Sequence, residues 1–277
     1  MSTSINNNIL ALTAQRSISR TQNDLDSALT RLSSGLRINY AWDDPGGLAV
    51  SERFRAQIES MDEAERNANY NVNLLATAEG ALQTIDDTLS RMRALTIQAS
   101  NGALQSQDRI SLNTEFQELK SEIDRIASTT NYNGLYLLAG AYSSNGMKFH
   151  IGTYNVSGQD YYYVTLNDMR SSALGLSGLS LLTTLSAQNA IGSIDAAINT
   201  KDTERTRIGS QVSRLQNTIE NLQVASENAN ASESTIRDAD IAEEMSAFVR
   251  AQLLMETGIS MLSQANMIPQ IVAGLVG

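Results

Sequence analysis

The residue types that usually catalyse reactions or bind metals are scarce in this sequence. His150 is its only histidine and it has no cysteine, which excludes HExxH zinc sites, serine–histidine–aspartate triads and thiol nucleophiles. Carboxylates do occur close together, at Asp43-Asp44 and at Asp238-Ala239-Asp240. Each group precedes a predicted helix, where carboxylates accept hydrogen bonds from free N–H groups and favour the helix dipole. We therefore expect helix caps rather than a cation site, no catalytic residues, no cofactor, and a protein that is not an enzyme.

Charge and hydropathy argue against two classes of partner. The 277 residues include 20 Lys and Arg and 30 Asp and Glu, a formal net charge of −10, which disfavours binding to nucleic acid or to anionic membranes. The most apolar stretch, 267–277, is far shorter than the roughly 20 residues that span a membrane. The first ten residues show no basic segment followed by an apolar run. We expect a soluble or polymeric protein, without nucleic acid binding or membrane insertion and without a cleaved signal peptide.

Apolar residues recur at alternating steps of three and four over much of the chain, which is the spacing of coiled-coil helices. The pattern predicts helices at about 5–32, 54–101, 112–126, 191–222 and 234–267. Between the third and fourth helices, apolar and polar residues alternate singly around a Gly/Asn/Ser-rich turn, which indicates a β-hairpin. The predicted fold class is mainly α: a long antiparallel coiled-coil helical bundle with a small β-hairpin region, and terminal helices that pair as a second helical domain.

The first and last predicted helices are apolar on more than one side. The seam of the last helix is predicted at Ile241, Met245, Phe248, Met255, Ile259 and Leu262. A helix with several apolar sides needs several neighbours, and in a polymer these neighbours are the terminal helices of other subunits. We expect self-assembly through Ile5, Ile9, Leu12, Ile18, Leu25, Leu29, Phe248, Leu254, Met255, Ile259 and Leu262.

The two ends of the chain also differ in charge. Residues 1–40 carry four arginines and two aspartates, whereas residues 234–277 carry two arginines and five acidic residues. Opposite net charges favour association of the two ends, although a solvated mixture of charges on two surface helices explains the same counts.

Four separated segments resemble bacterial flagellin. They are LTAQRSISRTQNDLDSALTRLSSGLRIN at 12–39, DDPGGLAVSERFRAQI at 43–58, IRDADIAEEM at 236–245 and MLSQANMIPQ at 261–270. They occur in the family's order at both ends, and NYNGLYLL at 131–138 resembles the element that closes the family's N-terminal half. The resemblance covers nearly the whole chain except about 140–185, so it implies a short flagellin that lacks the variable outer domains.

This resemblance implies a structural subunit of the bacterial flagellar filament, which assembles through its terminal helices into a helical tube used for motility. The implied partners are further flagellin subunits, the hook–filament junction and cap proteins, and the type III export apparatus with a flagellin chaperone. The implied location is the extracellular filament. Two other interpretations stay open: a hook–filament junction protein, which shares the design of the ends, and an amphipathic translocator or effector that inserts into host membranes.

The family's organisation also implies a division of the chain. Residues 1–33 would form the N-terminal helix of an inner-tube domain, 34–47 a linker, 48–130 the N-terminal helices of an outer-tube bundle, 131–183 the β-hairpin region, 184–228 the C-terminal helix of the bundle, and 229–277 a linker and the C-terminal helix of the inner-tube domain.

Two further contacts are expected at individual residues. Trp42 stands in the linker, where it either packs against the bundle or contacts a neighbouring subunit. The site that some flagellins present to the vertebrate Toll-like receptor has Arg and Leu positions that resemble Arg91 and Leu95, with Glu115 as the third member. Arg91 and Leu95 are four residues apart and so share a helical face. The alternative is that Arg91 is solvated while Leu95 packs in the bundle or against the next protofilament.

Overall fold

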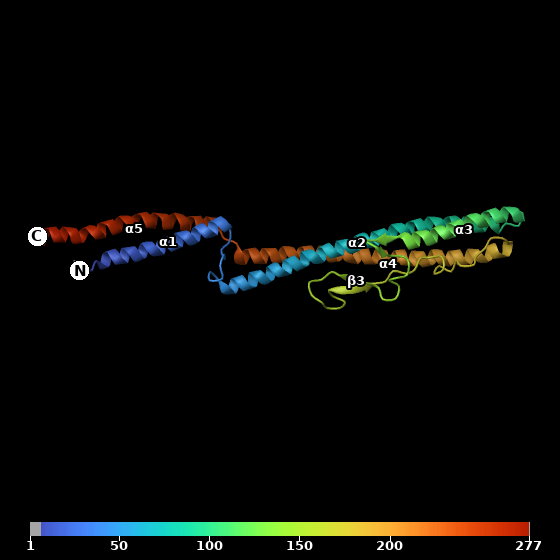
Figure 1. Cartoon of the computed structure of the whole chain (residues 1–277), viewed down its shortest axis with the longest axis horizontal. Helices are drawn as coiled ribbons and strands as arrows, with labels where there is room; N and C mark the ends of the chain where they lie inside the picture. The colour runs from blue at the N-terminus through green and yellow to red at the C-terminus, as the bar shows by residue number, and fades with distance from the viewer. Residues whose placement is uncertain (1–6, 277) are drawn as a thin grey trace. The chain divides into compact units, whose positions relative to one another are not determined.

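The structure, a computed structural model, describes residues 7–276, and side chains within that range up to residue 268. Its elements are α1 (Ile9–Ser34), α2 (Pro45–Ala99), α3 (Ser106–Thr129), β1 (Asn131–Tyr132), β2 (Leu135–Tyr136), β3 (Met147–His150), β4 (Tyr161–Val164), α4 (Thr184–Arg237) and α5 (Ile241–Val276) (Figure 1). The predicted fold class is confirmed. None of the described helices has a stretch long and apolar enough to cross a membrane.

The chain divides into two compact units. We call residues 1–58 and 228–277 the terminal unit and residues 59–227 the central unit. α1 and α5 belong to the terminal unit, and α3 and the two hairpins belong to the central unit. α4 continues to Arg237, further than its apolar seam predicts. Residues 223–236 contain no glycine or proline, so nothing in this stretch breaks the helix.

The helix ends have local causes. α1 ends where Gly35 adopts a left-handed conformation (φ 73°) and donates its N–H to the Arg31 carbonyl at 2.8 Å, a conformation that glycine adopts without strain. The Asp44 carboxylate accepts the Gly47 N–H at 2.8 Å near the start of α2. The Asp240 carboxylate accepts the Ala242 N–H at 2.8 Å near the start of α5. The carboxylate caps predicted at these two aspartates are therefore confirmed.

The core of the central unit follows one stripe of α2. Buried residues recur along it at steps of three and four, with one step of seven from Ala68 to Leu75: Met61, Ala64, Ala68, Leu75, Ala78, Leu82, Ile85, Leu89, Met92, Thr96 and Ala99. Residues of α3, such as Phe116 and Ile123, and of α4, such as Ile194, Ile208 and Leu215, complete the same core. α2, α3 and α4 accordingly lie alongside one another in this unit (Figure 1).

A charged cluster interrupts the apolar stripe of α4. Lys201 is buried and its ammonium lies 2.5 Å from Asp86 of α2 and 2.6 Å from Asp202. Arg205 lies 2.7 Å from Glu79 and 3.5 Å from Asp86. Burial alone lowers the pKa of Lys201, but its hydrogen bonds to Asp202 and Asp86 outweigh this and the pKa is raised. Because only one register pairs these groups, the cluster fixes how α2 and α4 are aligned.

The β region covers this core. β3 and β4 are antiparallel, with Phe149 opposite Tyr162 and His150 opposite Tyr161. Phe149 and Val164 are buried, whereas Lys148 and Tyr163 on the other face are exposed, so the predicted hairpin and its alternation are confirmed.

The segment between β4 and α4 is tied to α3 at two points. Asp124 accepts the Ser171 N–H at 2.7 Å, and Asn113 accepts the Leu181 N–H at 2.9 Å.

Candidate self-assembly surface

α1 and α5 pair as antiparallel helices in the terminal unit (Figure 1). At one end of the pair, Arg31 Nη1 lies 3.0 Å from a carboxylate oxygen of Glu244. At the other end, the Asn8 side chain donates to the Ala265 carbonyl at 2.8 Å. Between them, a Cβ added at Gly258 would lie only 2.9 Å from Cγ1 of Ile18. These three contacts fix the register of the two helices.

Large and small residues face each other along this seam. Ile18 lies opposite Gly258, and counting along the two antiparallel helices from this contact sets Leu25 at the level of Ala251 and Phe248 at the level of Ala28. The less exposed positions of α1 are Ala11, Ala14, Ile18, Thr21, Leu25, Ala28, Thr30, Arg31 and Leu32, and those of α5 with described side chains are Glu244, Phe248, Ala251, Met255, Gly258, Leu262 and Ala265. Because half of these side chains are small, the two helices approach closely but bury little apolar surface.

The predicted seam of α5 is therefore wrong at three positions. Ile241, Met245 and Ile259 are exposed, and the seam runs instead through alanine and glycine positions. Phe248, Met255 and Leu262 do lie on the seam and are partly buried.

The residues predicted for self-assembly divide into two groups. Ile18, Leu25, Phe248, Met255 and Leu262 are partly buried within the α1–α5 pair. Ile9, Leu12, Leu29, Leu254 and Ile259 are exposed, Ile9 to 67%. Ile5 lies outside the described residues.

An apolar stripe on α5 has no partner within the described part of the chain. Ile241, Met245, Val249 and Leu253 follow one another every four residues, and each is exposed. The last three line a shallow apolar depression. The predicted assembly residues do not include this stripe, although its spacing of four is visible in the sequence. Exposed apolar patches of this kind mark surfaces that bind other proteins.

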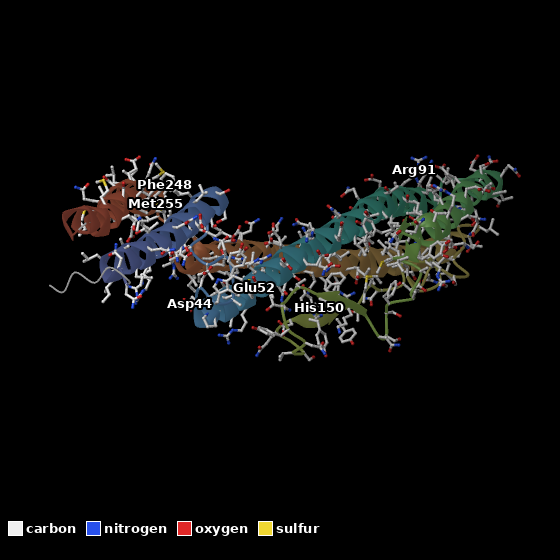
Figure 2. The ribbon with its side chains drawn as sticks, turned by 60° about the vertical axis from the view of Figure 1, so that its left-hand side comes forward. Asp44, Glu52, Arg91, His150, Phe248 and Met255 are labelled. Carbon is white, nitrogen blue, oxygen red and sulfur yellow. The ribbon has the colours of Figure 1, made fainter. Side chains whose placement is uncertain are left out.

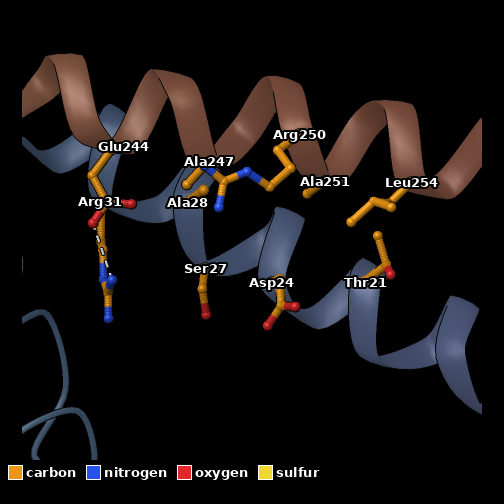
Figure 3. Close-up of a pocket in the computed structure, with 10 residues that line it drawn as sticks. All are labelled: Thr21, Asp24, Ser27, Ala28, Arg31, Glu244, Ala247, Arg250, Ala251 and Leu254. Atoms are coloured by element: carbon orange, nitrogen blue, oxygen red, sulfur yellow. Dashed lines mark hydrogen bonds and ion pairs between the residues drawn. The ribbon is translucent and has the colours of Figure 1, made fainter.

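A second surface feature is a polar groove of about 360 Å³ between α1 and α5. Arg31 and Glu244 point toward each other at one end of it, and Leu254 points toward Thr21 at the other (Figure 3). Asp24 and Arg250 line the groove between these ends. Its mixture of charged and apolar groups is typical of a contact surface for a protein, since a small-molecule site is enclosed and mostly apolar.

The segments that join the helices of the terminal unit are hydrogen-bonded to each other. The Arg37 N–H donates to the Arg237 carbonyl at 2.7 Å, and the Ala239 N–H donates to the Gly35 carbonyl at 2.9 Å. Trp42, in the loop that follows, is 77% exposed. Its ring stacks on that of Tyr40, with centroids 4.5 Å apart. The indole thus has one ring as its neighbour and presents the rest of its surface outward.

The three residues compared with a receptor site lie on the central unit. Arg91 is on the surface of α2 (Figure 2) and its guanidinium lies 2.6 Å from Glu115 of α3. Both side chains are largely exposed. Leu95 is only 1% exposed and belongs to the core. The structure therefore brings the arginine and the glutamate together at the surface and buries the leucine in the core.

Both ends of the chain match models of one family. Residues 5–143 match the bacterial flagellin N-terminal helical region, and residues 191–276 match the bacterial flagellin C-terminal helical region. The chain is similar to a flagellin of Halalkalibacterium halodurans, with 40% identity over 272 residues that cover 98% of this chain and 99% of the relative. It is also similar to flagellin FlaB1 of Treponema pallidum, with 38% identity over 273 residues that cover 95% and 96%.

A solved structure shares the fold. A putative flagellar hook-associated protein from Vibrio parahaemolyticus has a TM-score of 0.58, at 15% identity, over 71% of this chain and 100% of that one. The two family matches contain α1 and α5, whose exposed faces suit polymerisation, and the stretch between the matches contains β3 and β4. The chain therefore belongs to the bacterial flagellin family, and it is a self-polymerising structural subunit of the flagellar filament and not an enzyme.

Proposed function

We propose that the exposed apolar faces of α1 and α5 form the contacts between neighbouring subunits in the filament. The observation that carries this proposal is that both helices keep exposed large apolar side chains after they have paired with each other. Complete burial of one leucine or isoleucine side chain stabilises a contact by roughly 1.5–3 kcal/mol. Several such side chains on each helix supply more than the entropy cost of adding a subunit to a polymer.

Removal of either helix tests this proposal. Variants that lack residues 1–30 or residues 240–277 keep the whole central unit, so they are expected to stay helical by circular dichroism and to form no filaments on seeding. A finer variant is Leu253→Ser with Ile259→Ser, which removes apolar surface from α5 without touching its seam. Its control is Val156→Ser, an exposed apolar residue outside any helix. Filament growth by either truncation would exclude α1 and α5 as the assembly elements.

The two units would have different places in the filament. We assign α1 and α5 to an inner tube and the bundle of α2, α3 and α4 to an outer tube, with the segments around 34–47 and after 229 as linkers. Trp42 would contact a neighbouring subunit from the first linker, and its 77% exposure supports this. Trp42→Ala should weaken filaments while the fold of the subunit is retained. Unchanged filament stability on dilution would instead indicate that the indole has only its local contact with Tyr40.

Before assembly the apolar stripe of α5 needs protection. We propose that a flagellin chaperone covers α5 in the cytoplasm, and that the chain is exported by the flagellar type III apparatus. It would then be placed between the hook–filament junction proteins and the filament cap, outside the cell. Family membership and the exposure of Met245, Val249 and Leu253 support this. A strain without the export gate should retain the protein, and normal secretion from such a strain would refute export by this route.

A Toll-like receptor is a further partner that we propose, through Arg91 and Glu115. Their exposed ion pair offers a guanidinium and a carboxylate at one surface, and arginine is frequent among residues that dominate binding energy. Leu95 would support them from the core, not as an exposed anchor. In a reporter-cell assay with monomer, Arg91→Ala should lower potency about tenfold, or about 1.4 kcal/mol. Arg93→Ala, which breaks a similar exposed pair with Asp195, is the matched control, and equal potency of the two variants would count against the site.

A further inference from the structure

The lysine and arginine side chains of the two units are paired to different extents. Each lysine or arginine of residues 59–227 contacts an acid, a carbonyl, an amide or an aromatic ring of the same chain. Within the described residues of the terminal unit, by contrast, four arginines have no ion pair or hydrogen bond: Arg16, Arg20, Arg53 and Arg250. In the same described part of the unit, the carboxylates of Asp24, Asp26, Glu243 and Glu256 have no ion pair or hydrogen bond either.

Two of these arginines lie together on the outward side of α1. Arg16 and Arg20 are four residues apart, so they are neighbours on the helix surface, and both are exposed. They lie away from the seam positions Ile18 and Thr21. Two like charges at this spacing raise the energy of an isolated helix. An acidic group opposite the two arginines would relieve this repulsion.

An acidic residue with exposed apolar neighbours lies on the outward side of α5. Glu256 is exposed and stands three residues from both Leu253 and Ile259, which are exposed too. The outward side of α1 likewise combines apolar and charged residues, but its charge is positive: the exposed Ile9 and Leu12 precede Arg16. α1 as a whole carries three arginines and two aspartates, whereas α5 carries three glutamates and one arginine.

The register of α1 against α5 places Arg20 and Glu256 at the same level along the two helices. Ile18 faces Gly258, so Arg20 and Glu256 lie at the same height along the two helices, on outward sides. A second copy placed beside the first in the same orientation would bring its α1 against the α5 of the first without sliding along the axis. Such a contact repeats from copy to copy and extends a polymer.

We propose that α1 of one subunit docks on α5 of the adjacent subunit, with Arg16 and Arg20 pairing with Glu256 between flanking apolar contacts. This inference rests on the proposed function of the two helices as the assembly surface, and it names the charged groups that set which copy and which register are accepted. Electrostatic pairing of this kind selects partner and orientation, and like charges at the same place reject them.

Charge reversal tests the contact. Arg16→Glu with Arg20→Glu makes both outward sides acidic, and Glu256→Arg makes both basic. Each variant alone should show a critical concentration for assembly raised about tenfold or more. An equimolar mixture should assemble near the wild-type concentration, because each variant's α1 then meets an opposite charge on the other's α5. The control is Arg53→Glu with Arg66→Glu, which makes the same change in net charge on exposed residues of α2 and should assemble like the wild type.

The outcomes separate the two proposals. If the wild type assembles and the charge-reversed variants assemble equally well alone, the charged contact is wrong while the proposed assembly surface can still hold. A mixture that remains monomeric overturns the contact as well, since a pairing between copies must be restored by mixing. If either truncation forms filaments, the assembly surface itself is refuted.

Discussion

The variant Gly258→Val tests whether filament assembly needs the close packing of α1 against α5 or only apolar helices at the two ends of the chain. The structure places Cγ1 of Ile18 only 2.9 Å from a Cβ at position 258, closer than two carbon atoms can pack. Ile18 is β-branched and stiff at χ1, so relief requires α1 and α5 to move apart. Overpacking of this kind costs roughly 1–3 kcal/mol, against which the better helix propensity of valine returns only about 0.5 kcal/mol.

The critical concentration for filament growth measures this cost. A loss of about 1–3 kcal/mol per subunit raises it about 5- to 150-fold. Gly209→Val is the matched control, because a Cβ at this glycine of α4 meets nothing within 4 Å. Ile18→Ala combined with Gly258→Val should recover part of the loss, since the clashing Cγ1 is removed. Wild-type assembly by Gly258→Val, or a double variant no better than the single one, would refute the register described for this pair.

Three further changes probe other parts of the chain. Lys201→Met should lower the free energy of unfolding in urea by roughly 1–3 kcal/mol. This is less than the roughly 3–5 kcal/mol typical of a broken buried ion pair, because Asp86 still has Arg205 as an ion-pair partner. Adding Asp86→Leu to the same chain should restore part of the lost stability. Arg170 lowers the pKa of Asp168 from its ordinary 3.8 by hydrogen bonding, so the stabilisation is present above that value and is lost as the pH falls through the lower folded pKa. Thermal unfolding scans should therefore show a smaller decline below pH 4 for Asp168→Asn than for the parent. Leu262→Ala should weaken assembly by roughly 2 kcal/mol, the lower end of the range for core truncations, because Leu262 is only partly buried; an unchanged critical concentration would contradict its place on the seam.

The sequence predicts the central unit better than the terminal one for a physical reason. In α2 the stripe from Met61 to Met92 consists of large apolar residues and alanines at heptad spacing, so periodicity and burial coincide. In α5 the seam contains Ala251, Gly258 and Ala265, while larger residues such as Ile259 face outward. Hydrophobicity alone ranks these positions in the wrong order, because close approach of two helices requires small side chains.

The receptor residues show a second limit. The spacing of four residues predicts that Arg91 and Leu95 share a helical face, but Arg91 is exposed, whereas Leu95 is buried and continues the buried stripe three residues after Met92. Extending that stripe by one step would have predicted its burial. The ion pair of Arg91 with Glu115 of α3 depends on how two helices pack, which sequence spacing within one helix does not determine.

Labelling of a single thiol tests the central claim, that the outward stripe of α5 is buried between subunits. The chain has no cysteine, so Leu253→Cys introduces one reactive group at an exposed position of this stripe. A maleimide should modify it readily in the monomer, and about tenfold or more slowly in seeded filaments, because buried thiols are shielded from the reagent. Equal labelling rates in monomer and filament would show that this face of α5 stays open to solvent in the polymer and would contradict the account.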